Sequence, residues 1–254
     1  MIENAVSRAS RPVLTIDSSK SVKDAAEFMA ARNLRRLAVV QEGKVIGVFS
    51  AFHLIRMLAT GLDPSQRPLA EANIDVPVYV DPTSSIIEAA KVMASRDVTA
   101  VLVGREPNPI GILTTHDLVS AMSSSYVGSA RLHEALVNTY PTVDPGATLL
   151  EAASIISSRG TSGVIVMDGD DLLGVLTVRD VVQTYAAGGL ESLSAKVGDV
   201  PMPPAAYIDE GGTVSEATEA MEARGTDVAV VLCGPKVCGG VDDISLSRWL
   251  ASKY

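Results

Sequence analysis

The sequence predicts an α/β fold of the α+β type, built from four β-α-β-β-α repeats that pair back to back into two modules. The pattern Met-x-x-Arg occurs at residues 29–32, 93–96 and 221–224, and Ile-x-x-Arg occurs at residues 156–159. A glycine follows each copy at a constant distance, at Gly47, Gly111, Gly174 and Gly239. Both series repeat after 64, 63 and 65 residues. This regular period indicates an array of one structural unit.

The size of the repeat predicts how the units are organised. A unit of roughly 60 residues buries too little surface to be stable alone, whereas a pair of units has the size of an ordinary domain. The chain has 254 residues, of which 47% are hydrophobic, enough for a core once units pair. A polar stretch at residues 123–129 divides it evenly. We therefore expect one module at residues 1–126, with repeats near 10–60 and 75–125, and another at 127–254, with repeats near 137–188 and 200–254.

The first half of each repeat reads as a strand followed by a helix. Extended apolar stretches at residues 12–16, 76–80, 140–143 and 205–208 are each followed by a polar turn. A capping box of the form Ser/Thr-x-x-Asp/Glu comes next, in which the hydroxyl and the acid satisfy free amides of a first helical turn. The four boxes are Ser21 with Asp24, Ser85 with Glu88, Thr148 with Glu151, and Thr213 with Glu216. Apolar residues then recur at helical spacing.

The second half of each repeat reads as two strands and a helix. Short apolar runs are joined by turns that contain Gly, Pro, Asn or Asp. The paired runs are 37–40 with 45–49, 100–103 with 110–113, 164–167 with 172–176, and 228–232 with 237–241. A second helix closes each repeat, as at residues 118–122 and 181–185.

The junction of the last strand and the last helix is the candidate functional motif. Repeats two and three carry Thr-x-x-Asp there, and the capping role alone explains this pattern as well as a ligand does. The other two repeats keep a capping residue but lose the acid, so the acid has a second use in repeats two and three.

A carboxylate at this position of the motif can accept two hydrogen bonds from a ribose diol, and the helix N-terminus suits a phosphate. His116 or Arg179 can face that phosphate, and the small residues Ala100 or Gly163 leave room for a flat base. This chemistry predicts a nucleotide site and not a catalytic one.

The order of elements, the period and the motif Gly-hydrophobic-hydrophobic-Thr-x-x-Asp resemble the cystathionine-β-synthase (CBS) domain family over nearly the whole chain. The resemblance implies two clefts per module that bind AMP, ADP, ATP or S-adenosylmethionine. It implies that the acid of the motif holds the ribose hydroxyls and that the threonine assists with ribose or phosphate.

Carried over to this sequence, the resemblance implicates two sites. The first comprises Thr114, His116 and Asp117, with the base near Val78, Thr99, Ala100 and Val101. The second comprises Thr177, Arg179 and Asp180, with the base near Thr142, Ser162, Gly163 and Val164. Repeats one and four depart from the motif at His53, Asp242 and Ser245. Arg35 and Arg36 are candidates for phosphate contacts, although a solvated strand edge is the favoured interpretation of this pair.

These features favour a regulatory protein that senses an adenosine nucleotide and acts on an unidentified partner protein. The alternative is an assembly scaffold whose clefts bind nothing. The resemblance also implies that the modules form a disc, within one chain or in a homodimer. No nucleophile or acid–base pair indicates an enzyme, and no catalytic cofactor is expected.

Composition and cysteine usage exclude other classes. A net charge of −9 and 4% aromatic residues argue against nucleic-acid binding. We see neither a signal peptide nor an apolar run long enough to span a membrane, so we expect a cytoplasmic protein. His53, His116 and His133 lack metal-ligand spacing. Two thiols in a packed hairpin are the favoured state of Cys233 and Cys238, with a cross-strand disulfide as the alternative.

Overall fold

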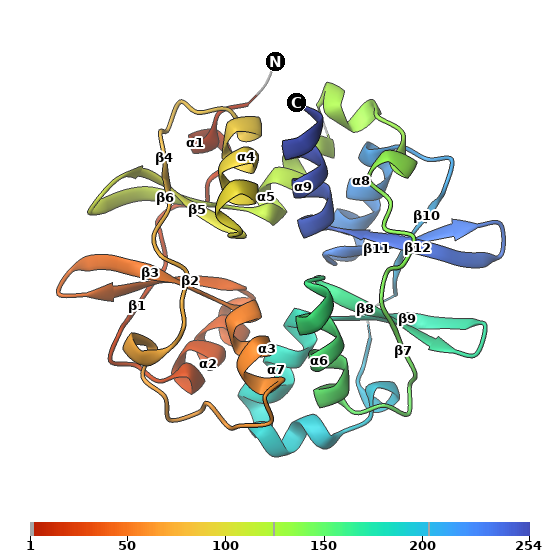
Figure 1. The fold of residues 1–254 in the computed structure, drawn as a ribbon, viewed down its shortest axis with the longest axis horizontal. Coiled ribbons are helices and arrows are strands. Elements are labelled where there is room, and N and C mark those ends of the chain that lie inside the picture. The colour runs from red at the N-terminus through yellow and green to blue at the C-terminus, as the bar shows by residue number, and fades with distance from the viewer. Residues whose placement is uncertain (1–2, 124, 203) are drawn as a thin grey trace.

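The computed structural model describes residues 3–123, 125–202 and 204–254. Four similar units surround a common centre, and the β-hairpins of all four point outward (Figure 1). Repeat 1 lies beside repeat 2 on one side, and repeat 3 lies beside repeat 4 on the other. The predicted fold class is confirmed, because each unit is a strand, a helix, two strands and a helix in that order.

The elements of the first two repeats follow the predicted order. A short helix α1 (Ala5–Arg8) precedes them. Repeat 1 contains β1 (Thr15–Asp17), α2 (Val22–Arg32), β2 (Arg36–Gln41), β3 (Lys44–Ser50) and α3 (Ala51–Leu58). Repeat 2 contains β4 (Tyr79–Val80), α4 (Ile86–Arg96), β5 (Ala100–Arg105), β6 (Asn108–Thr114) and α5 (Thr115–Ser123).

The last two repeats have the same sequence of elements. Repeat 3 contains β7 (Thr142–Val143), α6 (Leu149–Arg159), β8 (Gly163–Asp168), β9 (Asp171–Thr177) and α7 (Val178–Gly188). Repeat 4 contains β10 (Ala206–Asp209), α8 (Val214–Arg224), β11 (Val228–Cys233), β12 (Lys236–Asp242) and α9 (Asp243–Lys253). Short 3-10 turns lie in the connections between repeats. The division of the chain after residue 126 stays a prediction.

The recurring sequence pattern is explained by the first helix of each repeat. All four predicted capping boxes form, and each helix begins at the residue after its Ser or Thr. Met29 and its equivalents point into the core and are at most 2% exposed. The arginine of the pattern is the last residue of each of these helices, where its positive charge interacts favourably with the negative end of the helix dipole.

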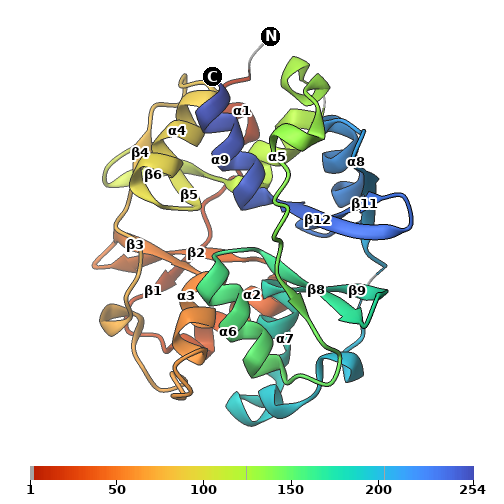
Figure 2. The same cartoon turned by 45° about the vertical axis from the view of Figure 1, so that its right-hand side comes forward.

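Two layers of contacts hold the repeats together. Within each module, the three-stranded sheets face one another across small apolar clusters, one between repeats 1 and 2 and one between repeats 3 and 4. Between modules, helices of repeat 1 pack on those of repeat 3, and helices of repeat 2 pack on those of repeat 4 (Figure 2). Both inter-module interfaces therefore form within a single chain, and the disc that the resemblance implies closes without a second copy.

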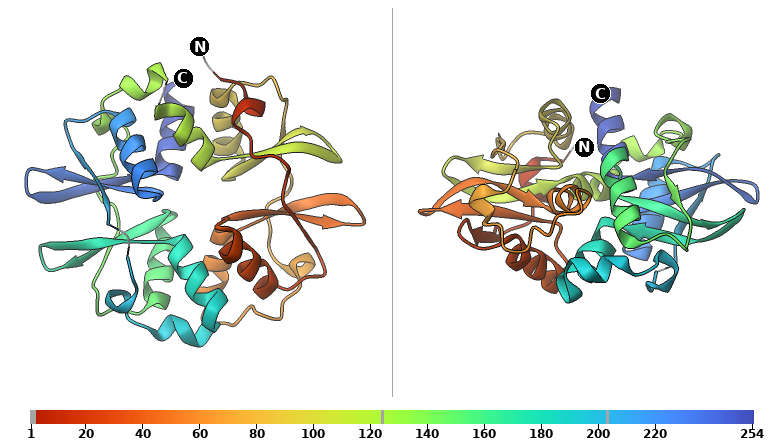
Figure 3. Two further views of the ribbon diagram at one scale, coloured as in Figure 1. Left: turned by 180° about the vertical axis from the view of Figure 1, so that it is seen from behind. Right: turned by 60° about the horizontal axis from the view of Figure 1, so that its bottom comes forward.

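The linker that enters each module crosses onto the partner repeat before it joins its own sheet. Ser10 bridges Ile112 of repeat 2, five residues before β1 begins in repeat 1. The N-terminal segment can be followed from one repeat to the other when the molecule is seen from behind (Figure 3). A Cβ atom on Gly111 would lie 2.9 Å from Ala9, and one on Gly239 would lie 2.6 Å from the carbonyl of Val137. The repeated glycine thus makes room for the crossing linker.

The cysteine expectation is wrong. Cys233 and Cys238 form a disulfide across the hairpin of β11 and β12, with their Cα atoms 5.7 Å apart. The hairpin is irregular here: Cys233 pairs with Lys236 and the register shifts between Val231 and Leu232, so the disulfide joins two positions that are not paired in the register. No helix among the described residues has the length and hydropathy needed to cross a membrane.

Candidate functional site

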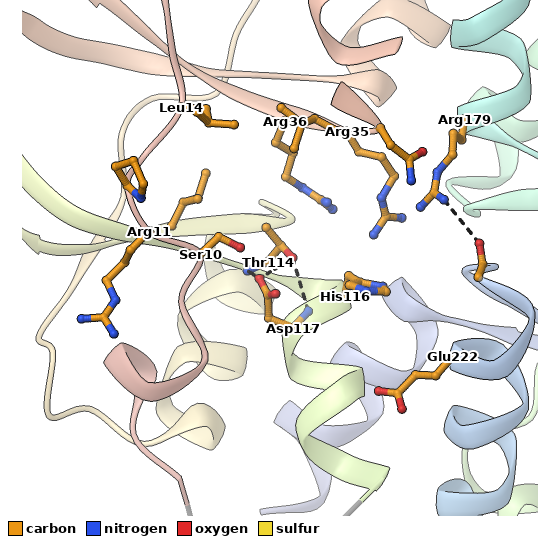
Figure 4. Close-up of a pocket in the computed structure, with 15 residues that line it drawn as sticks. Ser10, Arg11, Leu14, Arg35, Arg36, Thr114, His116, Asp117, Arg179 and Glu222 are labelled. Carbon is orange, nitrogen blue, oxygen red and sulfur yellow. Dashed lines mark hydrogen bonds between the residues drawn. The ribbon is translucent and has the colours of Figure 1, made fainter. Parts of the chain in front are cut away.

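A cavity of about 620 Å³ opens where all four repeats meet, next to the Thr-x-x-Asp motif of repeat 2 (Figure 4). Arg35, Arg36 and Arg179 lie along one side, and Thr114, His116 and Asp117 lie opposite. Each repeat contributes to the walls. Repeat 1 and its linker supply Ser10, Arg11, Pro12, Leu14, Asn33, Leu34, Arg35 and Arg36; repeat 2 supplies Ile112, Thr114, His116 and Asp117; repeats 3 and 4 supply Arg179, Glu222 and Gly225.

The carboxylate of Asp117 caps its own helix and still faces the cavity. Its Oδ2 accepts hydrogen bonds from the Thr114 backbone amide at 2.8 Å and from the Thr114 hydroxyl at 2.7 Å. The capping interpretation of the motif is therefore correct for this oxygen. All of these bonds use Oδ2, so Oδ1 can accept hydrogen bonds from a ligand.

Arg36 carries a buried positive charge that no carboxylate neutralises directly. It is 8% exposed, so the expectation of a solvated strand edge is wrong. Its guanidinium donates to the hydroxyls of Thr99 at 3.1 Å and Thr115 at 3.0 Å, and within the described residues it forms no ion pair. Burial, with a smaller contribution from the neighbouring Arg35, lowers the pKa of Arg36 to about 10. A bound anion would relieve this cost of burying an unpaired charge.

Arg35, by contrast, is paired across the centre of the disc. Its Nη1 lies 2.9 Å from Asp227 Oδ2 and 3.2 Å from Asp243 Oδ2, both in repeat 4. Burial alone would lower the pKa of Arg35, but the two carboxylates together outweigh it and raise the pKa. Burial similarly acts to raise the pKa of Asp227, yet Arg35, His116 and Arg179 together hold it well below its usual range.

His116 and Arg179 complete the polar side of the cavity. His116 Nδ1 lies 3.1 Å from Asp227 Oδ1, and Arg179 Nη2 lies 3.4 Å from Asp227 Oδ2. Arg179 also donates to the carbonyl of Gly225 at 3.3 Å. The resemblance assigned Arg179 to the second site, but the structure turns it toward the first, because the start of α7 faces the centre of the disc.

The apolar side of the cavity comes from the linker and from the partner repeat. Pro12, Leu14, Leu34 and Ile112 form a surface against which a flat ring could pack. The residues predicted to hold the base lie elsewhere. Ala100 and Val101 are buried in β5, Val78 packs against the core, and Thr99 binds Arg36. The reason is that the cleft lies between two repeats and not within one.

The residues of the second predicted site are not gathered in one cavity. Asp180 caps α7 through Thr177, at 2.7 and 2.6 Å, and lines an open groove of about 490 Å³ with residues such as Thr184 and Pro201. Partial burial raises the pKa of Asp180 despite these bonds. The residues expected to flank the base have other surroundings: Thr142 is exposed, Ser162 binds Asp242 and Asp243, Val164 lies in the core, and a Cβ on Gly163 would lie 2.5 Å from the Leu176 carbonyl.

In module 2, the counterpart of the Asp117 cleft is filled by a tyrosine. Tyr140 lies over Gly240, where a Cβ would come within 2.8 Å of its ring, and its hydroxyl donates to Asp242 Oδ2 at 2.9 Å. The amide of Ser162 donates to the same oxygen at 2.8 Å. Burial raises the pKa of Tyr140 and of Asp242. Ser245 replaces the acid of the motif here and forms the capping box with Asp242.

The remaining cleft, at the motif of repeat 1, holds a histidine where the acid would be. His53 Nδ1 lies 3.0 Å from the Ser50 amide, and Nε2 lies 3.2 Å from Asp75. The hollow beside it measures about 270 Å³. The four equivalent positions therefore differ, and the cavity beside Asp117 is larger than the other hollows described above.

A model of the CBS domain matches residues 5–60, 71–124 and 134–187, which together make up more than half of the chain. The chain belongs to the CBS domain family. The match covers the first three repeats of this CBS protein, and repeat 4 lies beyond it.

Relatives and solved structures agree with this assignment. CBS domain-containing protein YhcV of Bacillus subtilis is 28% identical over 120 residues, which are 46% of this chain and 85% of that protein. A protein of Thermofilum pendens, described as an uncharacterized 33.4 kDa protein in the ribosomal RNA operon, is 26% identical over 63% of this chain; the match spans 57% of that relative's length. Protein MJ1225 of Methanocaldococcus jannaschii superposes with a TM-score of 0.83 at 15% identity, over 98% of this chain and 100% of that one. The superposition extends the shared fold to repeat 4.

Asp227 and several residues that line the cavity were missed from the sequence, and comparison of the repeats offers a signal for Asp227 alone. Arg35, Thr99, Ser162 and Asp227 occupy equivalent positions just before the second strand of each repeat. At this position repeat 1 has a basic residue and repeat 4 has an acidic one, whereas repeats 2 and 3 have hydroxyl side chains. The opposite charges indicate that repeats 1 and 4 form a polar contact there. The linker residues Ser10, Pro12 and Leu14 carry no comparable signal, because only the crossing places them beside Ile112.

Proposed function

We propose that the cavity beside Asp117 binds an adenosine-containing nucleotide and that the protein is a regulatory ligand sensor. The observation that carries the proposal is Arg36, a buried cation on the cavity wall that contacts only hydroxyls. A buried charge of this kind is costly unless it is paired, so an anionic ligand is its expected partner.

The cavity accommodates the parts of a nucleotide in a consistent order. Asp117 Oδ1 would accept hydrogen bonds from the ribose diol. The phosphate would lie toward Arg36, with Arg179 on the same side of the cavity and His116 on the opposite side. The base would pack between Leu14 and Ile112. AMP, ADP, ATP and S-adenosylmethionine are the candidate ligands, and MJ1225, which shares the fold, is described as a candidate archaeal homologue of g-AMPK.

Ligand occupancy would be coupled to the packing of the modules. Because the cavity walls come from all four repeats, a bound ligand favours the arrangement in which both modules meet. We propose that a partner protein responds to this shift. The partner itself, a homodimer and a cytoplasmic location remain predictions. The disulfide bears on the last of these, since cytosolic disulfides are uncommon outside hyperthermophiles.

Isothermal titration calorimetry with the four candidate ligands tests the proposal. We expect micromolar binding of at least one ligand to the wild-type chain and its loss in Asp117→Ala. The substitution also removes a helix cap worth about 1 kcal/mol. Glu216→Ala is the matched control, because it removes an equivalent capping acid away from the cavity and should leave binding intact.

Two other outcomes are informative. Asp180→Ala reports on the second predicted site, since a ligand there would give two sites in the wild type and one in this variant. The absence of heat and of thermal stabilisation with all four ligands would favour the alternative, an assembly scaffold with clefts that bind nothing.

A further inference from the structure

An acidic side chain of the protein lies behind the basic residues that line the cavity. Asp227 is 1% exposed and contacts three basic side chains: Arg35 at 2.9 Å, His116 at 3.1 Å and Arg179 at 3.4 Å. It belongs to repeat 4, whereas all three of these side chains come from other repeats. Arg36 lines the cavity together with these basic side chains, but unlike Arg35 and Arg179 it makes no ion pair with a described residue.

We propose that Asp227 is a specificity-determining residue that restricts the ligand to an adenosine nucleotide with a single phosphate and disfavours the di- and triphosphates. This inference rests on the proposed function, since it concerns the same cavity. It names the ligand among the candidates that the family resemblance leaves open.

The charges around the cavity carry the argument. A monophosphate can take the free charge of Arg36 and share donors with His116 and Arg179. Each additional phosphate brings another negative charge toward Asp227 and meets no further unpaired arginine in this wall. Arg11 also lines the cavity, but its guanidinium extends away from the other arginines (Figure 4). Like charges in a poorly solvated site repel strongly, so the larger ligands should bind more weakly.

Asp227 is a better candidate for this role than the neighbouring acid. Asp243 accepts hydrogen bonds from the hydroxyls of Thr115, at 2.6 Å, and Ser162, so its charge is largely committed to the centre of the disc. Asp227 instead bonds to the two cavity-lining side chains that a phosphate would also use, His116 and Arg179. The equivalent positions in the first three repeats are Arg35, Thr99 and Ser162, none of which is acidic.

The test is a calorimetric series with adenosine, AMP, ADP and ATP. On the wild-type chain we expect AMP to bind at least tenfold more tightly than either adenosine or ATP. Asp227→Asn keeps the side-chain volume, frees Arg179 from its ion pair and leaves Arg35 paired with Asp243 alone, so the ratio of the ATP and AMP dissociation constants should fall at least tenfold. Glu219→Gln is the matched control, because it removes one negative charge from an exposed position on α8 outside the cavity and should leave the ratio within threefold.

The outcomes separate the two proposals. ATP binding as tight as AMP binding in the wild type would overturn the selection, whether or not Asp227→Asn folds. An unchanged ratio in a folded Asp227→Asn chain, verified by circular dichroism, would also overturn it. In both cases the proposed function would stand, whereas no binding of any member of the series, together with none of S-adenosylmethionine, would overturn the proposed function itself.

Discussion

The two modules contain the same cleft in two states, one open and one filled by the chain itself. Val13 of the first linker and Tyr140 of the second are equivalent, each lying two residues before the strand residue that pairs with the central strand. Opposite them, module 1 has Ile112 and module 2 has Gly240. A large ring therefore enters the cleft of module 2, and the cleft of module 1 stays available.

The polar groups of the two clefts also differ, because those of module 1 keep free hydrogen-bonding capacity and those of module 2 are bonded to the chain itself. In module 1, Asp117 keeps one carboxylate oxygen for the cavity, and Arg36 lacks an acidic partner. In module 2, the oxygen atoms of Asp242 are taken by Tyr140, Ser162 and the amide of Ser245. One cleft has unmet bonding capacity and the other has satisfied its own. A single fold can thus hold one open cleft and one cleft that is filled by the chain's own side chain.

Removing the tyrosine ring should produce the largest effect. Tyr140→Ala leaves a cavity beneath Gly240 and should lower the free energy of unfolding by about 3–5 kcal/mol. Val13→Ala at the equivalent position of the open cleft removes less buried surface and should cost about 1 kcal/mol. Urea unfolding followed by circular dichroism measures both. Similar losses in the two variants would mean that the two clefts are not differently packed.

Ligand should stabilise the protein through the open cleft. A nucleotide at 100 times its dissociation constant should raise the free energy of unfolding by about 2.7 kcal/mol. The same increment should appear in Tyr140→Phe and be absent in Asp117→Ala, in urea titrations with and without ligand. An increment that disappears in Tyr140→Phe would place the ligand in module 2.

The tyrosine hydroxyl should contribute a smaller amount than its ring. Tyr140→Phe removes the hydroxyl and its hydrogen bond to Asp242, and bonds to charged groups contribute about 1.5–3 kcal/mol, so a loss near the lower value is expected. The Ser162 amide remains as a donor to the same carboxylate and limits the loss. A loss as large as that of Tyr140→Ala would show that the hydroxyl, and not packing, closes this cleft.

The repeats, the helix caps and the strand pairs could be predicted from the sequence because each depends on residues close together in the chain. Thr114 and Asp117 form a capping box for the same local reason that Ser21 and Asp24 do. The walls of the cavity could not be predicted in this way. Leu14 reaches Ile112 only because a linker crosses between repeats, and Arg179 reaches Asp227 only because the modules pack face to face. The resemblance places the base near residues of repeat 2, whereas the apolar lining of the cavity comes from the linker of repeat 1 and from Ile112, and the roles of the acid and of the base-binding residues stay predictions.

The ionisation of Asp242 should give the smallest effect, seen as a change in the pH dependence of stability. Burial is the main cause of its raised pKa, and the neighbouring Asp243 adds to it, so the folded state holds a proton that the unfolded state releases. Between the ordinary aspartate pKa and the raised one, the folded chain binds more protons, and stability from this group must fall as the pH rises. The slope from one group is at most about 1.4 kcal/mol per pH unit.

Asp242→Asn removes this group from the titration, so the stability of the wild type relative to the variant should decline from pH 4 to pH 7. Asp180 has a raised pKa as well and contributes a slope of the same sign in both chains, so it cancels in the difference. A difference that is flat with pH would mean that Asp242 is ionised throughout, and that the filled cleft holds its carboxylate by hydrogen bonds strong enough to offset burial.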